Sequence, residues 1–395
     1  MFTVMGARAT FAVLYPAIVI DLGWSVAEVT TAFSAGLLVY PAAVILVGVL
    51  VDRLGCRATM LGGCGLLMAG MALLAVSTEL WQFYVAFIVA QGLGCAGVGF
   101  VAVVKMLAMR YPRRFAAAFG LASVGQGLGS LLISPAVQAV IDLSGWRAGA
   151  LTFVGVVGVG VLPLVILVAP GREPHHETHA RATLSQRPTA RSWLFLALFV
   201  SNAALGYQML LPTHQVAHLL SAGFAPMSAA TTAGLWGACG ALSALVCGWA
   251  LERWREAPLL ALAAALYGLG IVALITSTPD AAWLAAVFVL GAGLGRGILG
   301  ITLAAVSTRA FAGPRLGRIT GLLDLGFGIG AFLGPWLTAV VHDQSGSFGP
   351  GLASGILAAC VVSAGGVLGI RLAARASRQT VRASQGQPTE RAPQT

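Results

Sequence analysis

The chain carries twelve apolar runs, and each is long enough to cross a bilayer as an α-helix. A helix rises 1.5 Å per residue, so about 20 apolar residues cross the ~30 Å hydrocarbon layer. The runs cover residues 2–22, 27–51, 58–77, 81–108, 115–141, 147–169, 192–212, 228–250, 258–276, 282–307, 318–341 and 348–371. The expected fold class is therefore an all-α integral membrane protein with twelve transmembrane helices.

Composition supports this class. Of the 395 residues, 58% are hydrophobic and only 9% are charged, whereas a soluble domain has about 25% charged residues. The net charge of +10 would suggest a nucleic-acid partner in a soluble protein. Here most of the bases lie in loops and the tail, so the charge reports membrane topology and we expect no nucleic acid.

The distribution of charge predicts which ends of the spans face the cytoplasm. With the amino terminus inside, nearly all of the 23 Lys and Arg lie in cytoplasmic loops or the tail, and Arg147 lies outside. Lys and Arg are enriched in cytoplasmic loops, and Trp is enriched at membrane interfaces. The outer side then collects Asp21, Glu28, Glu79, Asp142, Asp280 and Asp343, with Trp24, Trp81, Trp146 and Trp283 near its interface. We expect a multi-pass protein of a bacterial inner membrane with both termini in the cytoplasm.

The two halves of the chain repeat one pattern. Gly92-Leu93-Gly94 recurs 201 positions later as Gly293-Leu294-Gly295, and Asp142 recurs as Asp343. The same offset relates Gly120, Gly125, Gly127 and Gly129 to Gly321, Gly326, Gly328 and Gly330. The pattern predicts two six-helix bundles, residues 1–169 and 192–371, with a site near the midplane where they meet.

The polar segments outside the bundles are predicted to lie in the cytoplasm. Residues 170–191 are rich in Arg, His, Glu and Pro, which is typical of a solvated linker. The linker's His175, His176 and His179 are read as incidental rather than as a metal site. Residues 372–395 are basic and rich in Ser and Gln. We expect this tail to be disordered and to lie against anionic lipid headgroups.

The short loop between the second and third spans carries a recognisable motif. It consists of Gly48, Asp52, Arg53, Gly55 and Arg57. An acid, two bases and a glycine in so short a turn are suited to tying neighbouring helix ends together. The spacing resembles the G-x-x-x-D-R-x-G-x-R loop of major facilitator superfamily transporters. That resemblance implies a fold in which the first, fourth, seventh and tenth helices line a central cavity.

Charged residues inside spans are the candidates for substrate binding, because an ionisable group at the centre of a span costs at least ~2.5–3.5 kcal/mol on insertion scales. Arg296 lies well inside the tenth span and Arg8 inside the first. A guanidinium suits a carboxylate, which it can bind with two hydrogen bonds. Arg296 could instead form an ion pair with Asp324 in the eleventh span, and Arg8 could reach the cytoplasmic interface.

Three further polar residues are candidates for the substrate site. Lys105 in the fourth span is read either as a ligand at the cavity floor or as a lysine that reaches the interface. Gln126 belongs to the glycine-rich run of the fifth span, and Gln208 lies in the seventh span, about two turns of helix below His214.

Two titratable residues are candidates for proton coupling or gating. His214 lies near the outer end of the seventh span, and its unperturbed pKa near 6.5 is in the working range. A polar residue facing the outer mouth is the alternative for His214. Asp324 is an acid inside a span, and we interpret it as a proton carrier, as the partner of Arg296 or as a brace near the cytoplasmic gate.

Within the superfamily, the amino-terminal half is similar to bacterial monocarboxylate and oxalate–formate type permeases. The residues that carry this resemblance are Gly6 to Arg8, Phe11, Tyr15-Pro16, Gly23-Trp24-Ser25, Arg113-Arg114 and Gly145-Trp146-Arg147. One feature departs from the pattern, because better-known members place a base in the eighth span and residues 227–250 here contain none.

These observations predict a secondary transporter that works by alternating access. Three intramembrane bases against one acid favour a small organic anion, above all a carboxylate, moved with protons by symport. The alternatives are proton-driven efflux of a drug or of a neutral or anionic metabolite, and a membrane sensor that has lost transport. We expect no enzyme activity, no cofactor and a monomer surrounded by lipid.

Overall fold

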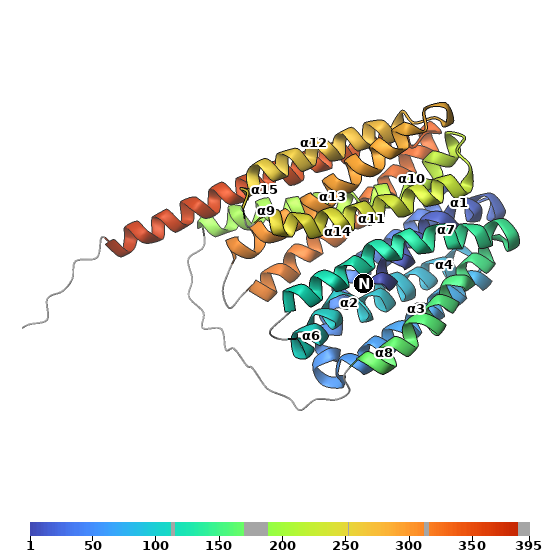
Figure 1. Cartoon of the computed structure of the whole chain (residues 1–395), viewed down its shortest axis with the longest axis horizontal. Helices are drawn as coiled ribbons and strands as arrows, with labels where there is room; N and C mark the ends of the chain where they lie inside the picture. The colour runs from blue at the N-terminus through green and yellow to red at the C-terminus, as the bar shows by residue number, and fades with distance from the viewer. Residues whose placement is uncertain (112–114, 170–188, 252, 312–315, 386–395) are drawn as a thin grey trace, which may run out of the picture.

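The computed structural model describes residues 1–111, 115–169, 189–251, 253–311 and 316–385. These residues form helices and turns, without a strand (Figure 1). Eleven of the helices are long and apolar enough to span a membrane. One of them, Leu121–Val168, has 48 residues and bends at Gly145, where φ is 80°. It therefore contains two spans, and the described chain makes the predicted twelve crossings.

The amino-terminal half occupies the blue to green part of Figure 1. Its helices are α1 Phe2–Leu22, α2 Val26–Leu54, α3 Cys56–Val76, α4 Leu80–Phe87, α5 Cys95–Gly97, α6 Phe100–Arg110, α7 Phe115–Gly155 and α8 Leu162–Val168. Two π-helical segments, Ile88–Gly94 and Val156–Val161, interrupt the fourth and sixth spans. A π-helical turn inside a span often marks a functional site.

The carboxy-terminal half occupies the light green to red part of Figure 1. Its helices are α9 Thr189–Tyr207, α10 Leu210–Ser221, α11 Pro226–Ala250, α12 Glu256–Ile275, α13 Trp283–Ala310, α14 Leu316–Ser345 and α15 Gly349–Gln385. The seventh span consists of α9 and α10, which are separated by a break at Gln208 and Met209. The tenth span, α13, is one continuous helix although its counterpart in the first half is interrupted.

Equivalent close contacts show that the sequence repeat is also a structural repeat. A Cβ at Gly129 would collide with the backbone of Phe2, and a Cβ at Gly330 would collide with the backbone of Ala203. These two pairs are related by the same offset of 201 residues. Without a strong hydrophobic force between helices in lipid, close backbone packing through small residues drives their association. The glycines are therefore where each bundle packs most tightly.

Small residues also form the contact between the halves. Gly127 of α7 lies against Ala241 of α11, and Gly328 of α14 lies against Pro41 of α2. Ser130 of α7 adds a hydrogen bond of 3.4 Å to the carbonyl of Ala233 in α11. Two pseudo-equivalent helix pairs thus join the bundles along the middle of the molecule.

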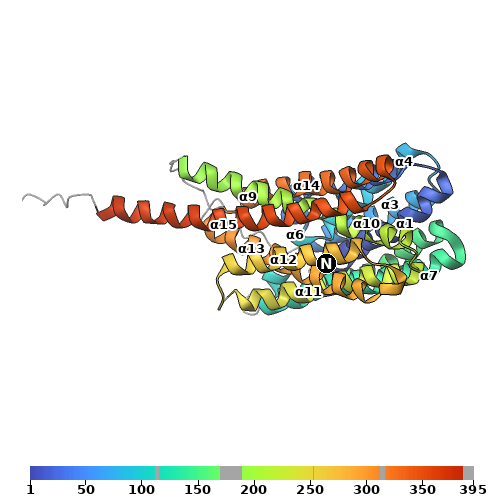
Figure 2. The ribbon, with the colours of Figure 1, turned by 90° about the horizontal axis from the view of Figure 1, so that it is seen from above.

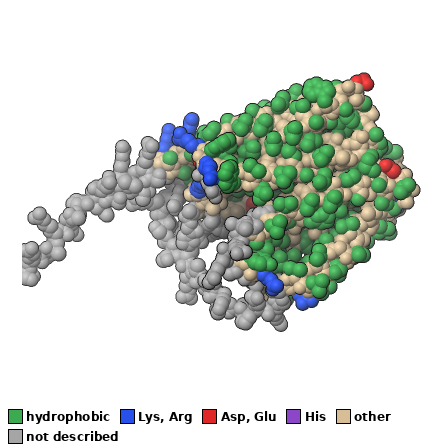
Figure 3. Space-filling model, viewed as in Figure 1, with side chains coloured by type: hydrophobic (Ala, Val, Ile, Leu, Met, Phe, Trp, Pro, Cys, Tyr) green, Lys and Arg blue, Asp and Glu red, His purple; other side chains and the backbone are tan. Residues whose placement is uncertain are grey.

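The surface agrees with a membrane protein of defined orientation. Hydrophobic side chains cover most of the face in Figure 3, with Lys and Arg at one end and acidic side chains at the opposite end. The carboxy-terminal helix α15 projects beyond the bundle at the basic end (Figure 2). Its backbone stays helical to Gln385, past residue 371 where a disordered tail was predicted to begin. Ala, Arg and Gln favour helix even where the apolar run has ended.

Two predicted segments fall wholly or partly outside the described residues. Most of the linker, including His175, His176 and His179, lies there, as do residues 386–395. Within the described ranges, no group of three or more His, Cys, Asp or Glu is placed to bind a metal.

Candidate functional site

Two arginines from opposite halves lie at a similar depth in the molecule. Arg8 lies on α1 and Arg296 on α13, each about 20 Å below the outer end of its helix at 1.5 Å per residue. The two guanidinium groups are close enough for their charges to interact. Because like charges repel, an anion lying between them would stabilise this arrangement.

Each arginine is associated with a tyrosine of its own half. The guanidinium carbon of Arg8 lies 5.6 Å from the ring centre of Tyr40, within the range of a cation–π contact. Arg296 interacts electrostatically with Tyr267, which is fully buried. Gly300 leaves room for the guanidinium of Arg296, since a Cβ there would lie 3.3 Å from Nη1. Neither tyrosine is identifiable from the sequence, because a neutral residue in a span carries no charge signal.

Several buried donor groups in the spans have no hydrogen-bond partner within the described chain. They include Nε of Arg8, Nε of Arg296, the hydroxyl of Tyr267, Nε1 of Trp236 and Nε2 of Gln91. Arginine Nε and tryptophan Nε1 can only donate. An unpaired buried polar group costs about 1–3 kcal/mol. The two guanidinium Nε groups and the Tyr267 hydroxyl therefore equip the centre to bind a ligand rich in acceptors.

Asp324 does not pair with Arg296. Its side chain is exposed, and neither a hydrogen bond nor an ion pair from it occurs among the described residues. It is near enough to Tyr40 of the other half for an electrostatic interaction. The alternative that Arg296 and Asp324 neutralise each other is therefore not what the structure shows.

The other candidates for the substrate site lie in different places. Lys105 forms an ion pair with Asp52, so it ties α6 to α2 at the basic end of the molecule. Gln126 donates to the sulfur of Met1 at 3.5 Å within the amino-terminal half. Gln208 is fully buried at the break in the seventh span, and both polar atoms of its amide lack a partner.

The motif loop connects α2 and α3 in a single residue. Gly55 has φ of 86°, a conformation that side-chain-bearing residues rarely adopt, which explains the glycine there. Asp52 provides the tie between helix ends that the sequence predicted, with Lys105 as its partner. Arg53 is exposed at the end of α2, and Arg57 lies in the first turn of α3. Gly48 has no atom close to its Cβ position, so packing does not require a glycine there.

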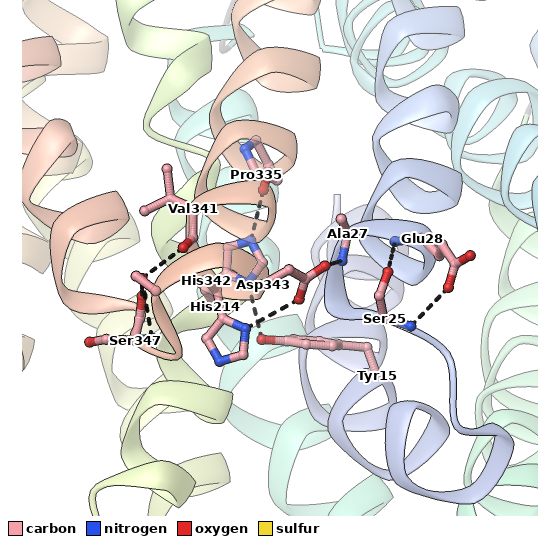
Figure 4. A network of polar contacts seen from close by, with 11 residues as sticks. Tyr15, Ser25, Ala27, Glu28, His214, Pro335, Val341, His342, Asp343 and Ser347 are labelled. Carbon is pink, nitrogen blue, oxygen red and sulfur yellow. Dashed lines mark hydrogen bonds and ion pairs between the residues drawn. The ribbon is translucent and has the colours of Figure 1, made fainter.

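His214 lies at the outer contact between the halves (Figure 4). It is fully buried, with Nδ1 3.0 Å from the hydroxyl of Tyr15 and Nε2 2.9 Å from the carbonyl oxygen of Pro335. The carbonyl can only accept, so Nε2 carries the proton and Tyr15 donates to Nδ1. This arrangement satisfies a neutral imidazole completely. His214 therefore joins α1 to α14 rather than facing an open mouth.

Comparison with known proteins places the chain in a family. Residues 1–335 match the model of the Major Facilitator Superfamily. The chain is 30% identical over 338 residues to human monocarboxylate transporter 11, which covers 81% of this chain and 69% of the relative. It is 28% identical over 309 residues to rat monocarboxylate transporter 3, covering 73% of this chain and 60% of the relative.

Solved structures show the same fold at lower identity. A bacterial homologue of the human drug peptide transporters superposes with a TM-score of 0.69 at 14% identity, covering 95% of this chain and 96% of the other. A bacterial homologue of the human lysosomal transporter Spinster superposes with a TM-score of 0.65 at 17% identity, covering 100% of this chain and 97% of the other. The chain belongs to the major facilitator superfamily, and it is a multi-pass membrane transporter rather than an enzyme. Its curated relatives are monocarboxylate transporters.

Proposed function

We propose that this protein is a secondary transporter that carries a small monocarboxylate together with protons by alternating access. The observation that carries the proposal is the pair Arg8 and Arg296, one from each half, with interacting charges and unpaired Nε groups. A carboxylate between them would relieve the repulsion and accept hydrogen bonds from both guanidinium groups. The names of the relatives support the same class of substrate.

The placement of the pair fits alternating access. A ligand that contacts both halves at the middle of the membrane stabilises whichever arrangement of the halves encloses it. The small-residue contacts Gly127–Ala241 and Gly328–Pro41 flank this level and allow the bundles to lie close while they rotate. His214 and Asp324 are the proposed proton sites, and the cytoplasmic side is the basic end of the molecule in a bacterial inner membrane.

Transport by purified protein in proteoliposomes tests the proposal. We expect uptake of a labelled short monocarboxylate, such as lactate or pyruvate, that increases when the outer medium is acidified. Arg296→Ala should reduce the rate at least tenfold, since it removes a charged hydrogen-bond donor. Arg253→Ala is the matched control, because Arg253 is exposed and stacks on Trp249 at 4.2 Å. Transport of lipophilic cations without transport of carboxylates would contradict the proposal.

A further inference from the structure

The outer ends of the two halves are joined by a hydrogen bond that has no equivalent in the other repeat. Asp343, at the carboxy-terminal end of α14, accepts a hydrogen bond of 2.9 Å from the backbone N–H of Ala27 in the first turn of α2 (Figure 4). The first amides of a helix have no partner within the helix, and its amino terminus attracts negative charge. A carboxylate of one half thus caps a helix of the other half.

We propose that two hydrogen bonds, from the Ala27 N–H to Asp343 and from the Tyr15 hydroxyl to His214, hold the outer end closed, and that protonation of His214 opens it. We call these four residues the outer latch. Both of its hydrogen bonds cross between the halves at the acidic end of the molecule. Opening the outer end must break both bonds. The inference rests on the proposed function for the role of the latch in transport, but the latch itself forms without substrate.

The repeat provides an internal comparison for Asp343. Asp142 lies 201 positions earlier, at the equivalent end of the fifth span. Its carboxylate accepts from Nε2 of Gln138 in its own helix at 2.7 Å. The residue of α11 that corresponds to Ala27 at the same offset is Ser228, and among the described residues no hydrogen bond joins its N–H to Asp142. The closing contact is therefore asymmetric.

An aromatic stack links the two bonds of the latch. His342 stacks on Phe348 with ring centres 3.9 Å apart, and Phe348 stacks on His214 at 5.3 Å. Nδ1 of His342 lies 3.4 Å from Oδ1 of Asp343, which leaves Oδ2 for Ala27. His342 therefore orients the carboxylate within its own half. It is a positioning residue for Asp343.

Acid weakens the His214 bond for a structural reason. In the closed arrangement Nδ1 of His214 accepts a hydrogen bond from the hydroxyl of Tyr15. Tyr15 is only 1% exposed, and among the described residues its hydroxyl bonds to His214. Protonation turns Nδ1 into a donor, so the Tyr15 proton loses its acceptor and a charge is left buried between the halves.

The groups around His214 do not offset the free-energy cost of burying its positive charge. The titratable groups facing it are Tyr15, His342 and Asp343, with His218 one turn along the same helix. Asp343 is already shared between His342 and Ala27. The closed state therefore favours neutral His214, and acid shifts the population toward the open state.

A distance measurement across the outer end tests the latch without substrate. Spin labels at Thr78→Cys and Thr278→Cys mark exposed outer loops of the two halves, in a background with the six native cysteines replaced. We expect Asp343→Ala to raise the outward-open to closed ratio by about tenfold, as for loss of a hydrogen bond to a charged group. Asp142→Ala should leave the ratio unchanged. Asp343→Asn, whose amide oxygen still accepts from Ala27, should stay close to the parent.

The proton switch is tested in the same experiment. Acidification from pH 8 to pH 5.5 should lengthen the distance in the parent and in His218→Gln. His214→Gln should abolish that response, because an amide accepts from Tyr15 and donates to Pro335 but does not titrate. Equal ratios for the Asp343→Ala and Asp142→Ala variants would overturn the latch, and a full acid response in His214→Gln would overturn the switch. Either failure would leave the carboxylate proposal standing, since no substrate is present.

Discussion

At the scale of single residues, the centre of the molecule is defined by groups that lack partners. Arg8, Arg296 and Tyr267 come from three helices, and each has a buried donor left unsatisfied in the described chain. A folded protein pairs nearly all of its buried polar groups. The unpaired donors of the two guanidinium groups and of Tyr267 are the reason we propose a ligand there.

The hydroxyl of Tyr267 gives a prediction that separates binding from folding. Tyr267→Phe should leave the unfolding midpoint of the substrate-free protein unchanged or raised, because the hydroxyl has no hydrogen bond to lose. Carboxylate affinity should fall roughly fivefold to tenfold, the effect of about 1 kcal/mol for one lost hydrogen bond. The checks are thermal unfolding and ligand titration of the same preparations.

Tyr207→Phe is the matched control for this change. The hydroxyl of Tyr207 is 2.9 Å from Oγ of Ser354, so its loss should destabilise the protein by about 1 kcal/mol. A clear loss of stability in Tyr267→Phe, with unchanged affinity, would show that the Tyr267 hydroxyl is structural.

The sequence predicted part of this site, and the reason for the limit is physical. Arg8 and Arg296 stand out because charge in a span is costly, and both lie near the centre. Lys105 gives the same signal, yet it pairs with Asp52, because position along a span does not reveal which neighbour lies across from it. Tyr40, Tyr267 and Asp343 give no such signal, and their roles depend on contacts between distant segments.

At the scale of helices, the apolar runs predicted element positions well. The predicted run 258–276 corresponds to Glu256–Ile275, and 282–307 corresponds to Trp283–Ala310. The predicted seventh span ended at 212, whereas α10 continues to Ser221. Thr213, His214, Gln215 and His218 lower the hydropathy there, but all four are buried. Hydropathy cannot foresee that polar side chains will be buried by packing, as His214 is by its contact with Tyr15 of the other half.

The interruption of the fourth span was also not predicted. A single run at 81–108 becomes α4, a π-helical segment, α5 and α6. The glycines in this run permit such irregularity without specifying it. Gly70 packs against Ala90, and Gly94 packs against Leu67. These contacts hold the π-helical segment against α3.

Helix packing gives a second prediction. A Cβ at Gly330 would collide with the backbone of Ala203, so Gly330→Ala should separate α14 from α9 and lower stability by about 1–3 kcal/mol or more. Gly321→Ala, on the same helix with nothing within 4 Å of the added Cβ, should be neutral or slightly stabilising. Thermal unfolding in detergent compares the two. Equal melting temperatures would mean that the close contact is not a packing constraint.

At the scale of the whole molecule, the two halves meet through small residues at mid-height and through the outer latch. The two described ion pairs nearest the basic end, Lys105–Asp52 and Arg309–Glu256, each stay within one half. Ion pairs and glycine contacts tie the helices of each bundle together, while the bundles contact each other mainly through two helix pairs, α7 with α11 and α14 with α2. This is the division expected of a molecule in which two rigid bodies move against each other.

Coupling to protons gives a prediction at this scale. With an anion and a proton carried together, an inward proton gradient should drive uptake above equilibrium, and dissipating the gradient should remove the excess. Asp324→Asn should abolish the accumulation while leaving exchange of labelled for unlabelled substrate, because exchange needs no net proton movement. Proteoliposome uptake with and without a protonophore measures both. Accumulation that survives in Asp324→Asn would exclude Asp324 as the proton site.

The most direct test of the central claim is the melting temperature of purified protein against a panel of monocarboxylates, dicarboxylates, lipophilic cations and neutral metabolites. A ligand at 100 times its dissociation constant should stabilise the folded protein by about 2.7 kcal/mol, whichever way transport runs. We expect monocarboxylates to raise the melting temperature, and Arg296→Ala to abolish the shift while Arg253→Ala retains it. Stabilisation by cations or neutral compounds instead, or a full carboxylate response in Arg296→Ala, would contradict the account.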